Sequence, residues 1–168
     1  MKFIIDIVVI IVFATTGFFL YHQYWNDFKN TWLTSEPVQT IYIGSVAIAV
    51  TVADTEEKRQ KGLSGVQKLR DLEGKLFVFP ESGHYGFWMK DMVMPIDIIW
   101  IDKNLQIVHF EENVSPDTYP KVFTPTEEAH FVLEMNAHFV SSLKLKLGDR
   151  LTLPSLLLTP DIKRNLQQ

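Results

Sequence analysis

Cysteine is absent from the 168 residues of this sequence. Its absence excludes disulfide bonds, thiolate metal sites and a cysteine nucleophile, and it leaves the redox compartment undecided. Glycine is also sparse, with eight dispersed residues that form no phosphate-binding loop. No serine lies within a Gly-x-Ser-x-Gly turn, the arrangement that exposes the nucleophile of many hydrolases.

Charged residues are few and nearly balanced. Asp, Glu, Lys and Arg together make up 21% of the chain, and the formal net charge is −4 at pH 7. Binding to nucleic acid generally needs a strongly basic surface, so we expect no nucleic-acid partner. The length fits one domain with an appendage, and a hydrophobic content of 46% is sufficient for a single core.

The N-terminal segment is the longest stretch without charge, because residues 7–26 contain no Lys, Arg, Asp or Glu. About 20 apolar residues are enough for a helix to cross a hydrocarbon layer of roughly 30 Å. We therefore predict that residues 1–25 form a membrane anchor, which contacts lipid through residues 7–25. The alternative is a cleavable signal peptide, although the apolar stretch is long for one and no A-x-A cleavage site follows it.

The orientation of this anchor follows from the position of its few charges. Lys2 and the terminal amine favour an N-terminus inside the cell, which places the globular part on the extracytoplasmic side. We expect residues 26–40 to be a tether, residues 41–153 to be the globular domain and residues 154–168 to be a C-terminal tail.

The body of the chain consists mainly of short β-branched or alternating segments between turn residues. The segments predicted as strands are 41–52 with a break at Gly44, 76–79, 87–92, 96–101, 105–110, 129–135 and 150–153. Asp54 and Glu57 have the spacing of a capping box, which predicts a helix ending near Gly62. A second short helix is predicted from Asn136 to Leu143. Residues 111–126 hold three prolines and are predicted to form a long loop.

These elements predict an α+β domain that is mainly antiparallel β. We expect a small barrel-like sheet, because closure removes exposed strand edges, with two or three short helices. The N-terminal transmembrane helix would precede this domain.

The stretch Phe87–Asp102 concentrates two tryptophans, three methionines and three aspartates in sixteen residues. If 87–92 is a strand, Trp88 and Lys90 share one face with Met92 and Met94. Trp88 could then hold an apolar or sugar-like ring while Lys90 attracts an anion. The alternative is that Trp88 fills one end of the barrel and Lys90 is only solvated.

Six segments in order resemble the DUF192 (UPF0127) family of small, often exported prokaryotic domains. They are 52–63 (VADTEEKRQKGL), 74–79 (GKLFVF), 87–90 (FWMK), 95–102 (PIDIIWID), 132–137 (VLEMNA) and 147–150 (LGDR). The resemblance implies a compact, mainly β fold, often with an export signal or anchor upstream, and it implies no reaction. His138 departs from the family, which usually has glycine there, and the sequence after Leu63 departs from the usual arginine-bearing pattern.

Three polar residues within apolar strands complete the candidate site. Asp97 needs backbone N–H groups, Lys90 or an arginine if it is buried, and it could instead bond the turn at Met94 and Pro95. Glu134 could pair with Asp97 for acid–base hydrolysis, or either could supply structural or ligand-binding polarity. Asn136 lies two residues beyond Glu134.

Methionine offers one further alternative. Met92 and Met94 lie near His84, and soft thioethers suit Cu(I), although methionine also fills gaps in cores. We expect neither a metal nor another cofactor. The preferred prediction is a membrane-tethered extracytoplasmic module that binds an unknown ligand or protein partner, with an envelope hydrolase and a copper-handling protein as alternatives. Its candidate ligand-binding residues are Trp88, Lys90, Asp97, Glu134 and Asn136.

Overall fold

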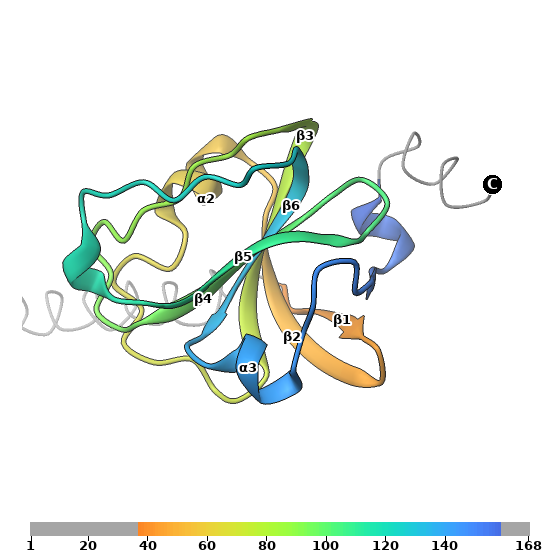
Figure 1. The fold of residues 1–168 in the computed structure, drawn as a ribbon, viewed down its shortest axis with the longest axis horizontal. Coiled ribbons are helices and arrows are strands. Elements are labelled where there is room, and N and C mark those ends of the chain that lie inside the picture. The colour runs from red at the N-terminus through yellow and green to blue at the C-terminus, as the bar shows by residue number, and fades with distance from the viewer. Residues whose placement is uncertain (1–36, 159–168) are drawn as a thin grey trace, which may run out of the picture. The chain divides into compact units, whose positions relative to one another are not determined.

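The computed structural model describes residues 37–158, which form a mostly β fold (Figure 1). The predicted anchor, most of the predicted tether and the last ten residues of the predicted tail lie outside the described residues. Within residues 37–158, no helix has the length and apolar character needed to cross a membrane.

One curled, seven-stranded sheet forms a half-barrel. The prediction of a mainly β, barrel-like sheet is therefore confirmed in outline. Its order is β5-β4-β6-β3-β2-β1-β7, and every neighbouring pair is antiparallel except β2 and β3. The strands are β1 (Gln39–Ile43), β2 (Val46–Ala53), β3 (Glu73–Gly83), β4 (Ile96–Ile101), β5 (Ile107–Val114), β6 (Ala129–Asn136) and β7 (Leu151–Thr152).

Strands β5 and β7 are the first and last in this order, and each is hydrogen-bonded to a residue next to the other. Ile107 donates from its backbone N–H to the carbonyl of Asp149, and Leu151 donates to the carbonyl of Leu105, both at 2.8 Å. An isolated bridge also joins Gln106 to Arg150. These contacts satisfy backbone groups that an open sheet would expose at its edges, and they hold the sheet in its curled form.

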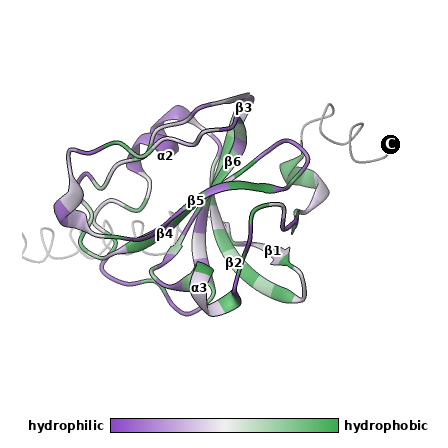
Figure 2. Ribbon diagram, in the orientation of Figure 1, coloured by the Kyte–Doolittle hydropathy of each residue, from purple (hydrophilic) through white to green (hydrophobic). Residues whose placement is uncertain are grey.

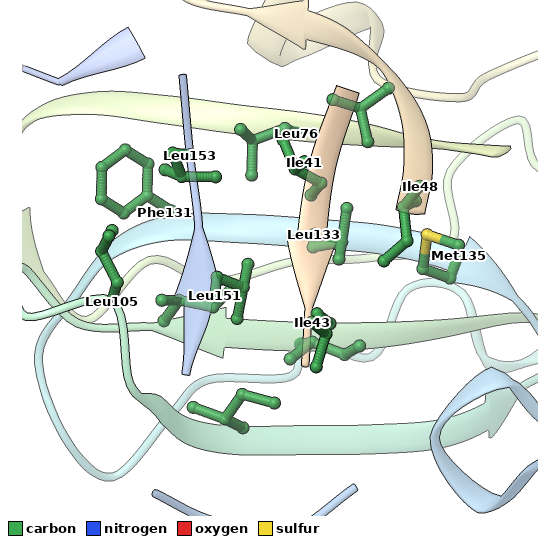
Figure 3. Packing of buried hydrophobic residues seen from close by; sticks show 14 of the residues in the cluster. Ile41, Ile43, Ile48, Leu76, Leu105, Phe131, Leu133, Met135, Leu151 and Leu153 are labelled. Carbon is green, nitrogen blue, oxygen red and sulfur yellow. The ribbon is translucent and has the colours of Figure 1, made fainter. Parts of the chain in front are cut away.

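Both faces of the sheet are covered by apolar residues. One cluster takes residues from all seven strands and fills the inside of the curl, where Ile41, Ile48, Leu133 and Leu151 pack together (Figure 3). The second cluster includes Phe77, Ile98, Trp100 and Val132 on the other face of the sheet, with Met89 and Phe123 from covering loops. Strand β2 is mainly hydrophobic, whereas the helix that follows it is hydrophilic (Figure 2).

Two short α-helices accompany the sheet within residues 37–158. Helix α2 (Glu56–Lys61) begins after Thr55, whose side chain accepts from the Lys58 N–H, so the predicted cap at Asp54 was one residue early. It ends at Gly62 as predicted. Helix α3 (Phe139–Leu143) begins after His138, and the Asn136 side chain does not cap it.

The 3₁₀ turns η1 (Pro116–Thr118) and η2 (Ser155–Leu157) complete the regular elements of the described residues. His138 has a φ of 69°, in the left-handed region where glycine is favoured. Glycine would adopt this conformation without the strain that a side chain adds.

The predicted hairpin of β4 and β5 is confirmed. The Asp102 carboxylate accepts hydrogen bonds from the backbone N–H groups of Asn104 and Gln106, each at 2.8 Å. The left-handed residue of the turn is Leu105, with a φ of 63°. Strand β5 continues to Val114, so the predicted loop at 111–126 begins later than expected.

The predicted strand at 87–92 is wrong. Within this segment only Phe87 makes a ladder contact, an isolated bridge to Phe123. Met89 and Met92 are both buried in the second apolar cluster, although strand alternation would put them on opposite faces. This segment is a covering loop over the sheet, positioned by contacts distant in sequence.

Candidate functional site

A pocket of about 830 Å³ lies between α2, residues 84–92 and the face of the sheet that carries β3 and β6. Aromatic side chains predominate among its apolar lining, namely Phe77, Phe79, Tyr85, Phe87 and Trp88. Its charged lining residues are Glu56, Arg59, Lys61, Lys90, Asp91 and Glu134. A concave, largely aromatic site with a few polar groups is the usual form of a small-molecule site.

Helix α2 supplies one wall, and Arg59 attaches that wall to the sheet. Its guanidinium donates to the carbonyl of Val78 at 2.9 Å and forms an ion pair with Glu56 at 3.3 Å. It also lies 5.3 Å above the centre of the Phe79 ring. Arg59 is therefore held in place by three interactions and shapes the wall of the pocket.

The loop of residues 84–92 supplies the opposite wall. Phe87 and Phe123 exchange two backbone hydrogen bonds of 2.8 Å, and the indole N–H of Trp100 donates to the carbonyl of Tyr85 at 2.8 Å. The Ser64 hydroxyl donates to the carbonyl of Lys90 at 3.0 Å, which ties this loop to the segment after α2. The backbone of this wall is thus held at both ends, by Phe123 and Trp100 near Tyr85 and Phe87 and by Ser64 at Lys90.

Glu134 lies at the floor of the pocket. It comes from the middle of β6, directly opposite Lys75 of β3 in the strand register, and its side chain is only 4% exposed. Its Oε2 atom is buried and accepts no hydrogen bond from any residue that the structure describes. A buried carboxyl oxygen without a partner is uncommon in proteins, which makes Glu134 a candidate functional residue.

Burial strongly perturbs this carboxyl group. Removal of water raises the pKa of Glu134 from 4.5 to about 8, while the charge of Lys75 acts in the opposite direction. The desolvation effect is the larger of the two. At neutral pH the Glu134 carboxyl is therefore mainly protonated, and it can donate as well as accept a hydrogen bond.

The structure brings three of the five predicted site residues together, since Trp88, Lys90 and Glu134 all line the pocket. Trp88 is 52% exposed and lies edge-on to Tyr119, with ring centres 6.1 Å apart. Exposed lining residues of this kind form the mouth of a pocket, whereas the buried Glu134 forms its floor.

Asp97 lies elsewhere. In the pairing of β4 with β6, Asp97 is opposite Met135 and Ile98 is opposite Glu134, so the two carboxyl groups point to opposite faces of the sheet. Asp97 is fully buried and accepts hydrogen bonds from the backbone N–H groups of Asn113, His138 and Val140. The expected backbone partners are confirmed, but they belong to β5, to α3 and to the residue that precedes α3, and the predicted turn at Met94 and Pro95 is not among them.

Asn136 is also outside the pocket lining. Its side-chain amide donates to the carbonyls of Leu69 and Arg70, at 3.4 and 3.0 Å, and so holds the loop that follows α2. Among the methionines, Met92 is buried in the apolar cluster and Met94 packs against it. His84 lies 3.2 Å from the carbonyl of Pro125. Within residues 37–158, no three His, Asp or Glu side chains form a group that could hold a metal ion.

Comparison with known proteins identifies the family. Residues 39–153 match the model of the protein family DUF192, described as Uncharacterized ACR. The chain belongs to the DUF192 family. A UPF0127 protein from Thermococcus gammatolerans (strain EJ3) is 30% identical to this DUF192 chain over 106 residues. That match covers 60% of this chain and 63% of the relative, so the chain spans less than two thirds of the relative's length.

Two solved structures share the fold of the DUF192 domain. A protein from Sinorhizobium meliloti 1021, described as a candidate transcription regulator, has a TM-score of 0.67 and 27% identity, and the match covers 71% of this chain and 96% of that one. A protein of unknown function from Novosphingobium aromaticivorans has a TM-score of 0.61 and 26% identity, covering 68% and 82% of the two chains.

Sequence reasoning missed much of the pocket of this DUF192 domain. It did not include Arg59 or the rest of the α2 wall, and although it named Glu134 it did not place Lys75 opposite it in the sheet. One signal was present: Lys75 and Glu134 each stand within an otherwise apolar segment, where an unpaired charge is costly. Pairing them required the register of β3 with β6, which the sequence does not contain.

Proposed function

We propose that this DUF192 domain is a binding module that takes a small, ring-bearing ligand into the pocket between α2 and residues 84–92. The observation that carries the proposal is the combination of an 830 Å³ aromatic pocket with one buried carboxyl group at its floor. Binding pockets commonly combine an apolar surface with a few oriented polar groups. The exposed Trp88 and Lys90 at the mouth would give the first contacts with the ligand.

Binding is favoured over hydrolysis by the position of the carboxyl groups. A glycan-cleaving pair must flank a single bond, with the two groups roughly 5 to 9.5 Å apart in one cleft. Asp97 and Glu134 face opposite sides of the sheet, so they do not meet this requirement. Copper handling has less support, because Met89 and Met92 are occupied in apolar packing.

Alanine substitutions at the mouth test the proposal. We expect Trp88→Ala and Lys90→Ala to weaken binding of ring-bearing fragments about tenfold, because they remove an aromatic surface and a hydrogen-bond donor. The thermal midpoint should change little, since Trp88 is 52% exposed and Lys90 is exposed. A fragment screen by ligand-observed NMR, followed by mapping on amide spectra, gives both affinities and binding positions.

The matched control is Leu147→Ala, which removes a side chain 63% exposed from a position that does not line the pocket. It should leave fragment binding unchanged. Fragments that bind equally well to all three variants, or whose amide shifts map away from α2 and residues 84–92, would contradict the proposed site.

The proposal also includes a membrane tether, with residues 1–25 as the anchor and the DUF192 domain on the extracytoplasmic side. It is supported by the uncharged stretch at residues 7–26 and by the position of Lys2. We propose no nucleic-acid partner, because the chain carries a net charge of −4. The Sinorhizobium protein is described as a candidate transcription regulator, but this chain lacks the net positive charge that binding to DNA generally needs.

Fractionation of cells tests the tether. The full-length chain is expected in the membrane fraction, and protease added outside the inner membrane should digest the domain. A variant that lacks residues 1–25 should move to the soluble fraction. Recovery of the full-length chain from the cytosol would contradict the anchor.

A further inference from the structure

We propose that the ligand of this pocket is a ring compound bearing a carboxylate, which is bound by Lys61 and Lys90 while the ring packs on Trp88. This inference rests on the proposed function and specifies the chemical class of its ligand. It is carried by two lysines from opposite walls at one edge of the pocket, by the charge behind the floor, and by the exposed ring beside Lys90.

The two lysines enter the pocket from opposite walls at the same edge. Lys61 is the last residue of α2, Lys90 belongs to the loop wall, and both are exposed residues of the lining. The Ser64 hydroxyl donates to the carbonyl of Lys90 at 3.0 Å, and the Gly65 N–H donates to the carbonyl of Asp91 at 2.9 Å. The segment after Lys61 is therefore bonded to the backbone that carries Lys90.

These two lysines are available to a ligand. In the described part of the chain, neither Lys61 nor Lys90 forms an ion pair. Arg59, by contrast, is already paired with Glu56 at 3.3 Å. The remaining acidic residue at the mouth is Asp91, so two lysines and one aspartate leave a net charge of +1 there. An anionic ligand is favoured over a cationic one at this mouth.

The floor of the pocket adds positive charge. Burial raises the pKa of Glu134 to about 8, so its carboxyl is mainly protonated at pH 7. Lys75 lies directly opposite Glu134 in the register of β3 with β6 and is 5% exposed. The pair therefore carries the positive charge of Lys75, and such a buried charge is screened less than a charge in water. It attracts an anion in the pocket without any contact between the ligand and Glu134. The chain as a whole has a net charge of −4, so the pocket is a positive region of an acidic protein.

Trp88 is the ring that a ligand can reach. Among the aromatic lining residues it alone is exposed, and its one ring contact within residues 37–158 is the edge-on contact with Tyr119. Met89 is only 1% exposed and packs into the core, so its neighbours Trp88 and Lys90 both project outward at the mouth. A ligand ring packed on the indole therefore has its substituents close to an ammonium group.

The small number of free charges favours a carboxylate over a phosphate. A carboxylate carries one negative charge, which matches the excess of one positive charge at the mouth. A phosphate group carries nearly two and is commonly held by an arginine fork or by several backbone N–H groups. The guanidinium of Arg59 is already bonded to Glu56 and to the carbonyl of Val78. Two lysines, each a compact point charge, are sufficient for a carboxylate.

Three indole compounds that share one ring and differ in charge test the inference. They are indole-3-acetate, indole-3-acetamide and tryptamine, and binding would be followed at pH 7 by amide chemical-shift titration of the full-length chain in an uncharged polyoxyethylene detergent. The acetate is expected to bind about tenfold more tightly than the acetamide, which has the same shape without the charge, and tryptamine more weakly than the acetate. Raising the salt concentration from about 0.05 to about 0.5 M should reduce the preference for the acetate to about threefold, since salt screens exposed charges.

Substitutions that remove one charge locate the bound carboxylate. In Lys61→Gln and in Lys90→Gln, the preference for the acetate over the acetamide should fall to about threefold, and in the double variant to about one, because glutamine keeps a donor but no charge. Asp91→Asn removes the opposing charge and should raise the preference about threefold. Lys103→Gln makes the same change of charge at an exposed position outside the pocket lining, and it should keep the tenfold preference.

The outcomes separate this inference from the function it deepens. Equal or tighter binding of the acetamide or of tryptamine would overturn it, and so would a preference for the acetate that survives in the double variant. If none of the three compounds binds while other ring-bearing fragments occupy the pocket, the anionic class is wrong and the binding function stands. If no fragment occupies the pocket, both are wrong. Each variant is judged by the ratio of two affinities, so a partial loss of folded protein does not imitate the expected result.

Discussion

Replacing Asp97 with alanine is expected to lower the free energy of unfolding by about 3 to 5 kcal/mol. The Asp97 carboxylate is fully buried and accepts three backbone hydrogen bonds, from Asn113 at 2.8 Å, His138 at 3.1 Å and Val140 at 2.8 Å. Alanine would leave these three N–H groups without their acceptor. The free energy of unfolding of a small domain is only about 5 to 15 kcal/mol, so this loss would be a large fraction of the total stability.

Two features of the backbone make the effect of Asp97 large. Asn113 and His138 have φ values of 51° and 69°, which are unfavourable for residues with side chains, and both donate to the same oxygen of Asp97. The Val140 N–H lies in the first turn of α3, so Asp97 also satisfies a group that the helix itself leaves free. One carboxylate therefore connects β4, β5 and α3.

Urea unfolding followed by circular dichroism measures this effect through the midpoint at constant slope. Asp97→Asn should cost less, about 1 to 3 kcal/mol, because it keeps one acceptor oxygen. Asp71→Ala, at an exposed position of the loop after α2, is the control and should change stability by less than about 0.5 kcal/mol. A midpoint for Asp97→Ala close to that of Asp71→Ala would show that these hydrogen bonds contribute little.

Elements defined by local patterns were predictable from the sequence. The hairpin of β4 and β5 follows from two apolar runs around Asp102, whose carboxylate bonds to the backbone of the next few residues. The end of α2 at Gly62 follows from the preference for glycine in the left-handed region. In both cases the interactions that determine the structure join residues fewer than five positions apart.

Elements defined by distant contacts were not predictable in this way. Residues 87–92 contain strand-forming side chains, yet they form a loop because Phe87 bonds to Phe123 and Met89 and Met92 both enter the same cluster. The site shows the same limit. Trp88 and Lys90 were predictable from their chemistry, whereas the separation of Asp97 from Glu134 depends on the register of β4 with β6.

The second large expected effect is a dependence of stability on pH. As the pH rises, wild type should become less stable relative to the Glu134→Gln variant. Burial raises the pKa of Glu134 from 4.5 to about 8 in the folded protein. Below pH 4.5 the group is protonated in both the folded and the unfolded states. As the pH rises from 4.5 to 8, the unfolded chain releases this proton while the folded protein keeps it, so folding becomes less favourable. Wild type should therefore lose stability across this range, by about 4 to 5 kcal/mol relative to the glutamine variant.

Comparison with Glu134→Gln is necessary because other groups also titrate between pH 4.5 and 8. Burial lowers the pKa of His130, so this residue makes the folded state more stable as the pH rises, which opposes the effect of Glu134. The difference between wild type and Glu134→Gln cancels the contribution of His130. Urea unfolding at pH 4.5, 6, 7 and 8 gives this difference directly, and Glu112→Gln, at an exposed position of β5, should run parallel to wild type.

A constant difference between wild type and Glu134→Gln from pH 4.5 to 8 would mean that Glu134 does not hold its proton across this range. A difference that grows with pH would show that the domain retains a destabilising acid at the floor of its pocket. Glutamine has nearly the same shape and would remove that cost, so packing alone does not explain the glutamate.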